Sequence, residues 1–296
     1  MMTNRFSIIK YPFLLIIYCL LSSCYLFSQD IEDLPNSPFG SARDCKGSNL
    51  VVNCFVSESK KPWTSVEKEE IITKENNGFE WLINQAHSWK QSPISFQQIS
   101  IGLEQDVLVP EIVHARSIKQ INRLKIHWAT YALHAAGIKN TYNFYDSLKK
   151  KYQVDNIVIL VFANKEGRSY AQPTTADFKN EGFVEGAVIY KNYYDNISPL
   201  SAATIMHEML HLYGSWDMYQ SDERSYDLQR RVNSAFQNSI MIDTYKRDIN
   251  TFNVDQLTSW RIGWTKTYWP WYEMFRQTGT EKQWTTIPGS GKNENE

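Results

Sequence analysis

The chain has 296 residues, of which 42% are hydrophobic, 14% aromatic and 21% charged, and its formal net charge is -1. These values are typical of a globular protein and exclude a largely disordered chain. The near-neutral charge, without a basic run, gives no indication of a nucleic-acid partner. The length allows one large domain or two small ones, and we find no internal repeat.

Residues 1–23 have the pattern of a bacterial signal peptide. Two basic residues precede an apolar run, Tyr11 to Leu21, which is shorter than a helix that spans a membrane. The run ends in Leu21-Ser22-Ser23-Cys24, which resembles a lipobox. This predicts an exported lipoprotein, anchored in the membrane of the cell envelope or surface through a lipid on Cys24. The alternative is cleavage a few residues later, which gives a secreted protein.

Residues 24–60 are rich in Pro, Ser, Asn and Gly, and we expect a tether or a small N-terminal extension. Cys45 and Cys54 lie in this stretch, and in an exported chain such a pair favours a disulfide. The polar residues 46–49 suit a looped hairpin that would join the two cysteines. An unpaired cysteine would instead be able to block a metal site as a latency switch.

The folded domain is predicted to cover residues 61–287. Its first predicted elements, from hydrophobic periodicity, are a helix at 80–89, a strand at 94–101, a long helix at 111–136 and a helix at 142–151. His127 and His134 share a face of the long helix, but the lack of a carboxylate motif between them argues against a second metal site.

The second half of the domain begins with an unbroken β-branched run at 157–162, which predicts a central strand buried on both faces. The remaining predicted elements are a loop at 164–175, a strand at 183–190, a helix from about Ser201, a helix at 253–262 and a disordered tail at 288–296.

The helix that starts near Ser201 carries the residues with the clearest chemistry. His207 and His211 are four residues apart, so on a helix they lie about 40° apart around the axis and roughly 6 Å apart along it. Two imidazoles in this arrangement can bind one metal ion. Glu208 points to the flank of such an ion, where its carboxylate can accept a proton from water.

The residues after this helix suit a third ligand. Gly214 falls where the helix is expected to end, and glycine adopts the left-handed C-cap conformation without strain. Asp217 follows the resulting turn and can complete a three-ligand zinc site with an open fourth position. Four other aspartates remain alternative third ligands, Asp227, Asp243, Asp248 and Asp255.

The pattern His-Glu-x-x-His-x-x-Gly-x-x-Asp, from His207 to Asp217, resembles the metzincin zinc metallopeptidases, in the variant with Asp that snapalysin-like enzymes have. The segment 239–243 is similar to the metzincin Met-turn, and Met241 comes 24 residues after Asp217. The resemblance implies an α+β, metzincin-like zincin fold with a mixed twisted sheet, a long N-terminal helix, a central zinc-binding helix and an edge strand at 183–190 along the cleft.

The resemblance also implies an activity: a monomeric, Zn²⁺-dependent endopeptidase that hydrolyses protein or peptide substrates through a metal-activated water, with Glu208 as the base. Tyr219 would either support Asp217 as a hydrogen-bond donor or only pack beside it. Many metzincins have an oxyanion-binding tyrosine two residues after the methionine of the turn. Asp243 occupies that position here, so a role for the next tyrosine, Tyr245, is in doubt.

A second hypothesis is a cell-surface lipoprotein that binds glycan or protein and keeps a vestigial zinc site. Its binding surface would be the aromatic residues of the C-terminal region, Trp260, Trp264, Tyr268, Trp269, Trp271 and Tyr272. Aromatic side chains are more often part of a core, however, and the retained Glu208 favours the enzyme.

Overall fold

The computed structural model describes residues 41–42, 44–58, 61–109, 128–172, 185–193, 198–219, 225–244 and 247–275. All of them fall within one unit of the chain, Asn36–Glu296. The predicted signal peptide with Cys24, the tail at 288–296 and Tyr245 lie outside the described residues. Of the predicted long helix at 111–136, residues 128–136 are described, and 128–135 are helical.

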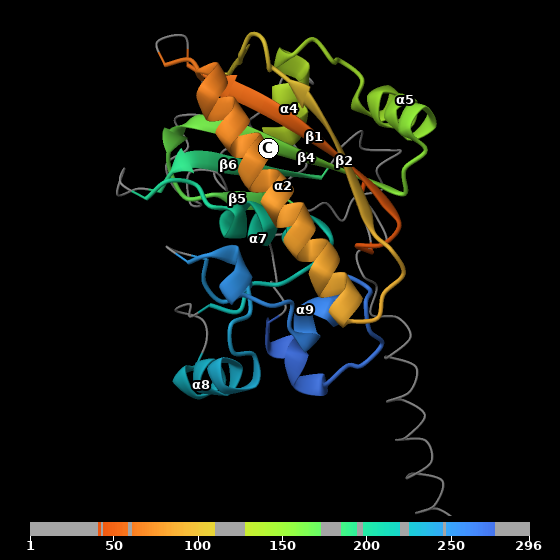
Figure 1. The fold of residues 1–296 in the computed structure, drawn as a ribbon, viewed down its shortest axis with the longest axis vertical. Helices are drawn as coiled ribbons and strands as arrows, with labels where there is room; N and C mark the ends of the chain where they lie inside the picture. The colour runs from red at the N-terminus through yellow and green to blue at the C-terminus, as the bar shows by residue number, and fades with distance from the viewer. Residues whose placement is uncertain are drawn as a thin grey trace, which may run out of the picture. The chain divides into compact units, whose positions relative to one another are not determined.

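A mostly parallel sheet forms the centre of the fold (Figure 1). Its strands follow the order β2-β1-β4-β6-β5, and β3 pairs with β1 off this path. All pairs are parallel except β5 with β6. The strands are β1 (Ser48–Ser57), β2 (Ser95–Ile101), β3 (Val107–Leu108), β4 (Asn156–Glu166), β5 (Tyr170–Gln172) and β6 (Gly186–Asn192). With the helices below, this confirms an α+β class containing a mixed sheet.

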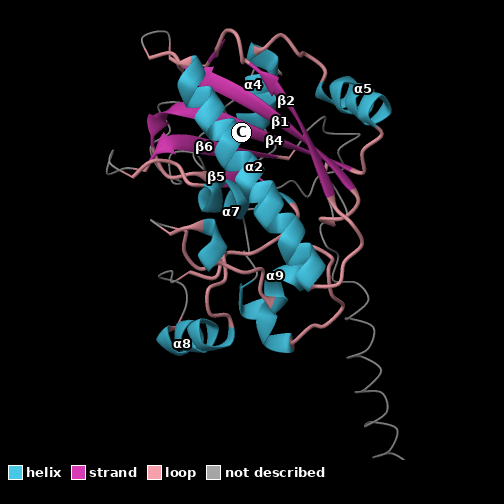
Figure 2. Cartoon of the chain, viewed as in Figure 1, coloured by secondary structure: helices cyan, strands magenta, loops and turns pink. Residues whose placement is uncertain are grey.

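Helices lie on both faces of the sheet. In β1, Leu50 and Val52 belong to a core cluster with Ala132 of α4, whereas Asn53 contacts Glu75 of α2. Because successive side chains of a strand point to opposite faces, α4 and α2 cover opposite faces. Figure 2 shows α2 running diagonally across the strands. The helices on and beside the sheet are α2 (Ser65–Ser88), α4 (Trp128–Ala135), α5 (Thr141–Tyr152) and α7 (Ala202–Leu212).

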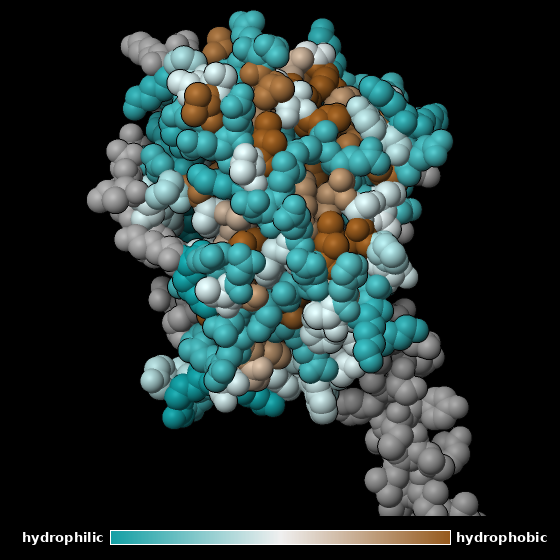
Figure 3. Space-filling view, viewed as in Figure 1, coloured by the Kyte–Doolittle hydropathy of each residue, from teal (hydrophilic) through white to brown (hydrophobic). Residues whose placement is uncertain are grey.

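The helix α2 begins well before the predicted residue 80. Thr64 and Glu67 form a capping box, which satisfies backbone N–H groups at the start of the helix. Ile71, Phe79 and Leu82 recur at helical spacing on its buried face. The opposite face is polar, and Figure 3 shows hydrophilic residues over much of this side of the molecule, with hydrophobic ones in small groups.

The prediction of a central strand at 157–162 is confirmed, because β4 lies between β1 and β6 and these six residues are buried. The prediction for 183–190 needs a correction. β6 is an inner strand, and the last strand in the order is β5, within the stretch expected to be a loop. β5 has only three residues, too few for a clear alternating pattern.

The stretch expected to be a tether contributes a central strand. β1 pairs with both β2 and β4, so the folded domain begins before residue 61. The predicted disulfide is also wrong, since Cys45 and Cys54 are both free and buried. Cys54 lies inside a continuous strand that starts at Ser48, where a rise of about 3.3 Å per residue carries it away from Cys45. Residues 46–49 do not form a hairpin.

The C-terminal part of the described chain contains short helices: α8 (Tyr226–Ala235), η1 (Ile249–Thr251), α9 (Gln256–Arg261) and η2 (Pro270–Phe275). The predicted helix at 253–262 is thus shorter, because Asp255 caps α9 through the Thr258 N–H. Aromatic rings of this region pack on one another, as Trp260 does on Tyr268 and Tyr272. Among the described helices, none has the length and apolar character that crossing a membrane requires.

Candidate metal centre

The helix α7 brings His207 and His211 together. Ser201 caps the helix by accepting a hydrogen bond from the Thr204 N–H at 3.1 Å. The two imidazole rings lie 4.8 Å apart between centroids and are nearly perpendicular, at 88°. Their Nε2 atoms are 3.2 Å apart. The helix therefore directs two nitrogen donors at one point, as the sequence spacing predicts.

Backbone carbonyls fix the tautomer of both histidines. His207 Nδ1 lies 2.9 Å from the Ile240 carbonyl oxygen, and His211 Nδ1 lies 2.8 Å from that of Ser215. A carbonyl oxygen can only accept, so each Nδ1 must carry the proton and donate it. In the neutral rings this leaves both Nε2 lone pairs free to bind a metal ion.

A turn after α7 places Asp217 at the same point. Gly214 has φ +101°, a left-handed conformation that favours glycine, and its N–H donates to the His211 carbonyl. Arg261 holds the turn by donating from Nε to the Gly214 carbonyl at 2.7 Å. Asp217 Oδ1 then lies 3.2 Å from His207 Nε2 and 3.1 Å from His211 Nε2.

The three donor atoms fit a zinc ion. Tetrahedral zinc with ligands at about 2.0–2.1 Å requires donors about 3.3–3.4 Å apart. The observed separations between His207 Nε2, His211 Nε2 and Asp217 Oδ1 are 3.1–3.2 Å, slightly smaller than this value. Two imidazoles and one carboxylate are also ligands that zinc prefers.

The electrostatics of the cluster indicate a place for positive charge. Burial raises the pKa of Asp217, but the two histidines outweigh this effect and hold that pKa well below its usual range. Burial lowers the pKa of His211, but Asp217 outweighs it and raises the value to about 9. A largely buried carboxylate next to two imidazoles thus stabilises a cation beside it.

Glu208 lies beside the three donors and is 6% exposed. Its carboxylate and the two imidazole donors all lie within 4.8 Å of one another, and the Asp217 oxygen is closer still to the imidazoles. Of the two carboxylates, that of Asp217 is therefore the better placed to share a metal ion with the two imidazoles. Burial is the largest influence on the Glu208 carboxyl and raises its pKa, which suits a group that accepts and returns a proton.

Two side chains extend the cluster outward. Tyr219 makes a side-chain hydrogen bond with Asp217, and burial with the nearby Asp217 charge raises the tyrosine pKa. The hydroxyl therefore remains protonated and can donate to the carboxylate. The guanidinium of Arg168 lies 5.0 Å above the centre of the Tyr219 ring. Sequence reasoning did not find Arg168, because a single arginine in a predicted loop carries no motif.

The turn containing Met241 holds His207 in place through the carbonyl of Ile240. Met241 is fully buried, and its carbonyl accepts from the Met218 N–H at 2.8 Å. Ser239 accepts from the Met241 N–H and donates to Asp255 at 2.5 Å, which fixes the turn to the start of α9. This arrangement holds the Ile240 carbonyl against His207 Nδ1.

The other candidate third ligands have different positions. Asp227 is highly exposed and pairs with Arg230 on α8. Asp248 caps η1, and Asp255 caps α9. Asp243 is exposed. In the described part of the chain, no group of three or more potential ligands lies away from His207 and His211, so neither His134 nor the free cysteines form another.

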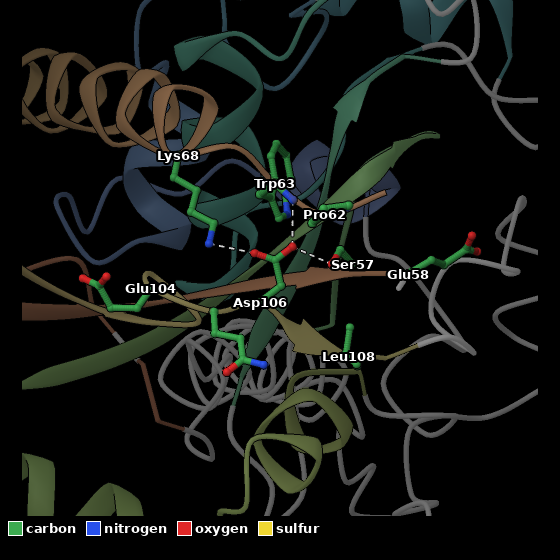
Figure 4. A pocket seen from close by; sticks show the side chains of 9 residues that line it. Ser57, Glu58, Pro62, Trp63, Lys68, Glu104, Asp106 and Leu108 are labelled. Carbon is green, nitrogen blue, oxygen red and sulfur yellow. Dashed lines mark hydrogen bonds and ion pairs between the residues drawn. The ribbon is translucent and has the colours of Figure 1, made fainter. Parts of the chain in front are cut away.

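A pocket of about 260 Å³ lies near the start of α2 (Figure 4). At its centre the Asp106 carboxylate pairs with Lys68 at 2.7 Å and accepts hydrogen bonds from Ser57 and the Trp63 N–H. Lys68 also donates to two backbone carbonyls. The buried polar groups thus pair with one another, and they connect α2 to the ends of β1 and β3.

No model of a known protein family matches the sequence, and a search of the curated proteins finds no match either.

Proposed function

We propose that the chain is a zinc-dependent endopeptidase of the metzincin type, with His207, His211 and Asp217 as zinc ligands. The observation that carries the proposal is the triangle of three donor atoms, 3.1–3.2 Å apart, with both histidine tautomers fixed. Two histidines that share a helix face by chance would not be expected to have both Nδ1 atoms hydrogen-bonded to backbone carbonyls. Nor would a carboxylate oxygen be expected within 3.2 Å of both Nε2 atoms.

The proposed chemistry assigns one role to each group. Zinc bound there supplies a Lewis acid for the peptide carbonyl and lowers the pKa of a water molecule. Glu208 takes a proton from the attacking water and later gives it to the leaving amine, which its raised pKa favours. Tyr219 holds the Asp217 carboxylate through its hydroxyl.

The fold around the site supports the comparison with metzincins. The helix α7 packs against β5, the last strand in the sheet order, which is antiparallel to its neighbour. An extended peptide could add to the outer edge of such a strand by main-chain hydrogen bonds. The methionine-containing turn that holds His207 corresponds in this proposal to the Met-turn, with Met241 beneath the metal.

The proposed substrate is an extended protein or peptide segment, cut by a monomeric enzyme. The proposal includes export and attachment to a membrane through a lipid on Cys24. A binding protein that uses exposed aromatic residues receives less support, because Trp260, Trp264 and Tyr272 are buried at 9%, 5% and 1% exposure. Trp269 is exposed at 52%, but the partly exposed Tyr268 and Trp271 pack on the buried rings of Trp260 and Tyr272.

The test combines metal content with activity. We expect about one zinc per purified chain, clear loss of zinc in Asp217→Ala, and no loss in a control at the exposed Asp227, Asp227→Ala. Glu208→Gln should keep the zinc and lose peptide cleavage by about 10²–10⁴-fold. A folded wild type without zinc, or equal cleavage by wild type and Glu208→Gln, would refute the proposed function.

A further inference from the structure

Arg168 lies in the turn between β4 and β5, and both of its neighbours are fixed to the region of β6. The Gly167 N–H donates to the Asn192 carbonyl at 2.9 Å, and Ser169 Oγ accepts from the Tyr190 N–H at 3.1 Å. Gly167 is buried, whereas Arg168 is exposed. The turn is therefore held in place and presents the arginine at the surface.

The guanidinium of Arg168 packs on Tyr219, at the border of the candidate metal centre. It lies 5.0 Å above the centre of the Tyr219 ring, and Tyr219 in turn hydrogen-bonds Asp217. Burial of part of the guanidinium lowers the Arg168 pKa. The nearby acidic groups, Tyr219, Asp217, Tyr193 and Glu208, outweigh this effect, so the pKa is raised overall. The arginine therefore remains charged within the electrostatic range of the site.

Among the described residues, Asp217 and Glu208 are the carboxylates whose charges act on Arg168. A divalent ion held by the three donors would balance these two negative charges. The positive charge of Arg168 would then remain to attract an anion. A guanidinium can bind a carboxylate through two parallel hydrogen bonds, and it does so with a geometry that lysine cannot reproduce.

We propose that Arg168 is a specificity-determining residue that binds a carboxylate of the peptide substrate close to the scissile bond. This inference rests on the proposed peptidase function. β5 starts at Tyr170, so a peptide added along its outer edge passes Arg168 at one end. The carboxylate is an acidic side chain or the free C-terminus, which share the same chemistry.

The test uses matched peptides derived from the best substrate in a library cleaved by the wild type. One arm compares Glu with Gln at each position flanking the cleaved bond, and the other compares a free C-terminal carboxylate with an amide. We expect the wild type to prefer one carboxylate form by at least about tenfold in kcat/KM. The arm that shows the preference identifies the source of the carboxylate.

Variants of Arg168 separate recognition from structural support. Arg168→Gln should abolish the preference, mainly through KM, so kcat/KM should fall far more on the carboxylate peptides than on their neutral counterparts. Arg168→Glu should favour peptides with Lys at the same position. The control Arg230→Gln removes an equal charge from the exposed surface of α8 and should keep the preference.

Three results would overturn the inference. Cleavage without a carboxylate preference would refute it and leave the peptidase function intact. Equal loss of kcat on acidic and neutral peptides in Arg168→Gln would assign Arg168 to support of Tyr219 or of the transition state instead. A wild type that cleaves no peptide would overturn the proposed function and this inference with it.

Discussion

Glu75 offers a quantitative test of the packing between α2 and the sheet. Its side chain is fully buried, and Oε2 accepts a hydrogen bond from Asn53 Nδ2 at 2.5 Å. Glu75 Oε1 and Asn53 Oδ1 have no hydrogen-bond partner among the described residues. An ionised Glu75 would therefore keep a buried oxygen without a donor, so burial favours the protonated acid.

Burial raises the pKa of Glu75 from its ordinary value of 4.5 to about 8. Because the folded state binds the proton more tightly than the unfolded state, folding loses stability as pH rises between these two values. At about 1.4 kcal/mol per unit, the contribution to the free energy of unfolding falls by on the order of 4 kcal/mol between pH 5 and 8. Full burial means that solvent does not screen this effect.

The substitution Glu75→Gln keeps the shape and replaces the ionisable oxygen by an amide donor for Asn53. We expect the variant to gain stability relative to the wild type as pH rises, by an amount of this order between pH 5 and 8. Urea unfolding of both chains at four pH values, with chelator present, measures the difference. The control Glu80→Gln removes a carboxylate from the exposed face of the same helix.

Parallel stability curves for wild type and Glu75→Gln across this range would refute the reasoning. They would show that Glu75 ionises with an ordinary pKa, through water or a rearrangement that solvates it. A large loss of stability in Glu75→Gln at pH 5 would show instead that the amide does not fit the buried site.

Two further substitutions test how α7 and its turn are held. Gly214→Ala should cost about 1–2 kcal/mol of stability and weaken zinc binding, because φ is +101° and Asp217 follows the turn. Chemical unfolding measures the stability, and a competition assay with a zinc chelator measures the zinc affinity. The control Gly137→Ala has φ +88° and open space for a Cβ, so it should lower stability without weakening zinc binding. Gly78→Ala places a Cβ 2.7 Å from Met206 Cγ and should destabilise by about 1 kcal/mol despite better helix propensity; a more stable variant would show that Met206 repacks freely.

Residues close together in the sequence could be predicted to lie together in the structure. His207, His211, the glycine turn and Asp217 all lie within 11 residues, so helix geometry brings the two histidines together and the turn can bring Asp217 near them. The central strand β4 could also be predicted from the sequence, since an unbroken run of β-branched and other apolar residues indicates a strand buried on both faces.

Features set by distant partners could not be predicted in this way. β1 has strong strand character, but the composition of its surroundings and the two cysteines favoured a tether with a disulfide. Its true role depends on pairing with β4, more than a hundred residues away. Arg168 and the Ile240 carbonyl likewise reach the site only through the tertiary fold.

These distant contacts explain how a short motif becomes a defined site. The motif on its own permits two histidine tautomers and several directions for Asp217. The Ile240 and Ser215 carbonyls select one tautomer, while Arg261 and Tyr219 restrict the turn and the carboxylate. Each contact removes freedom before any metal binds, so less conformational entropy is lost on binding. In the proposed zinc site, local sequence thus supplies the ligands, and the rest of the fold would set how tightly they bind the metal.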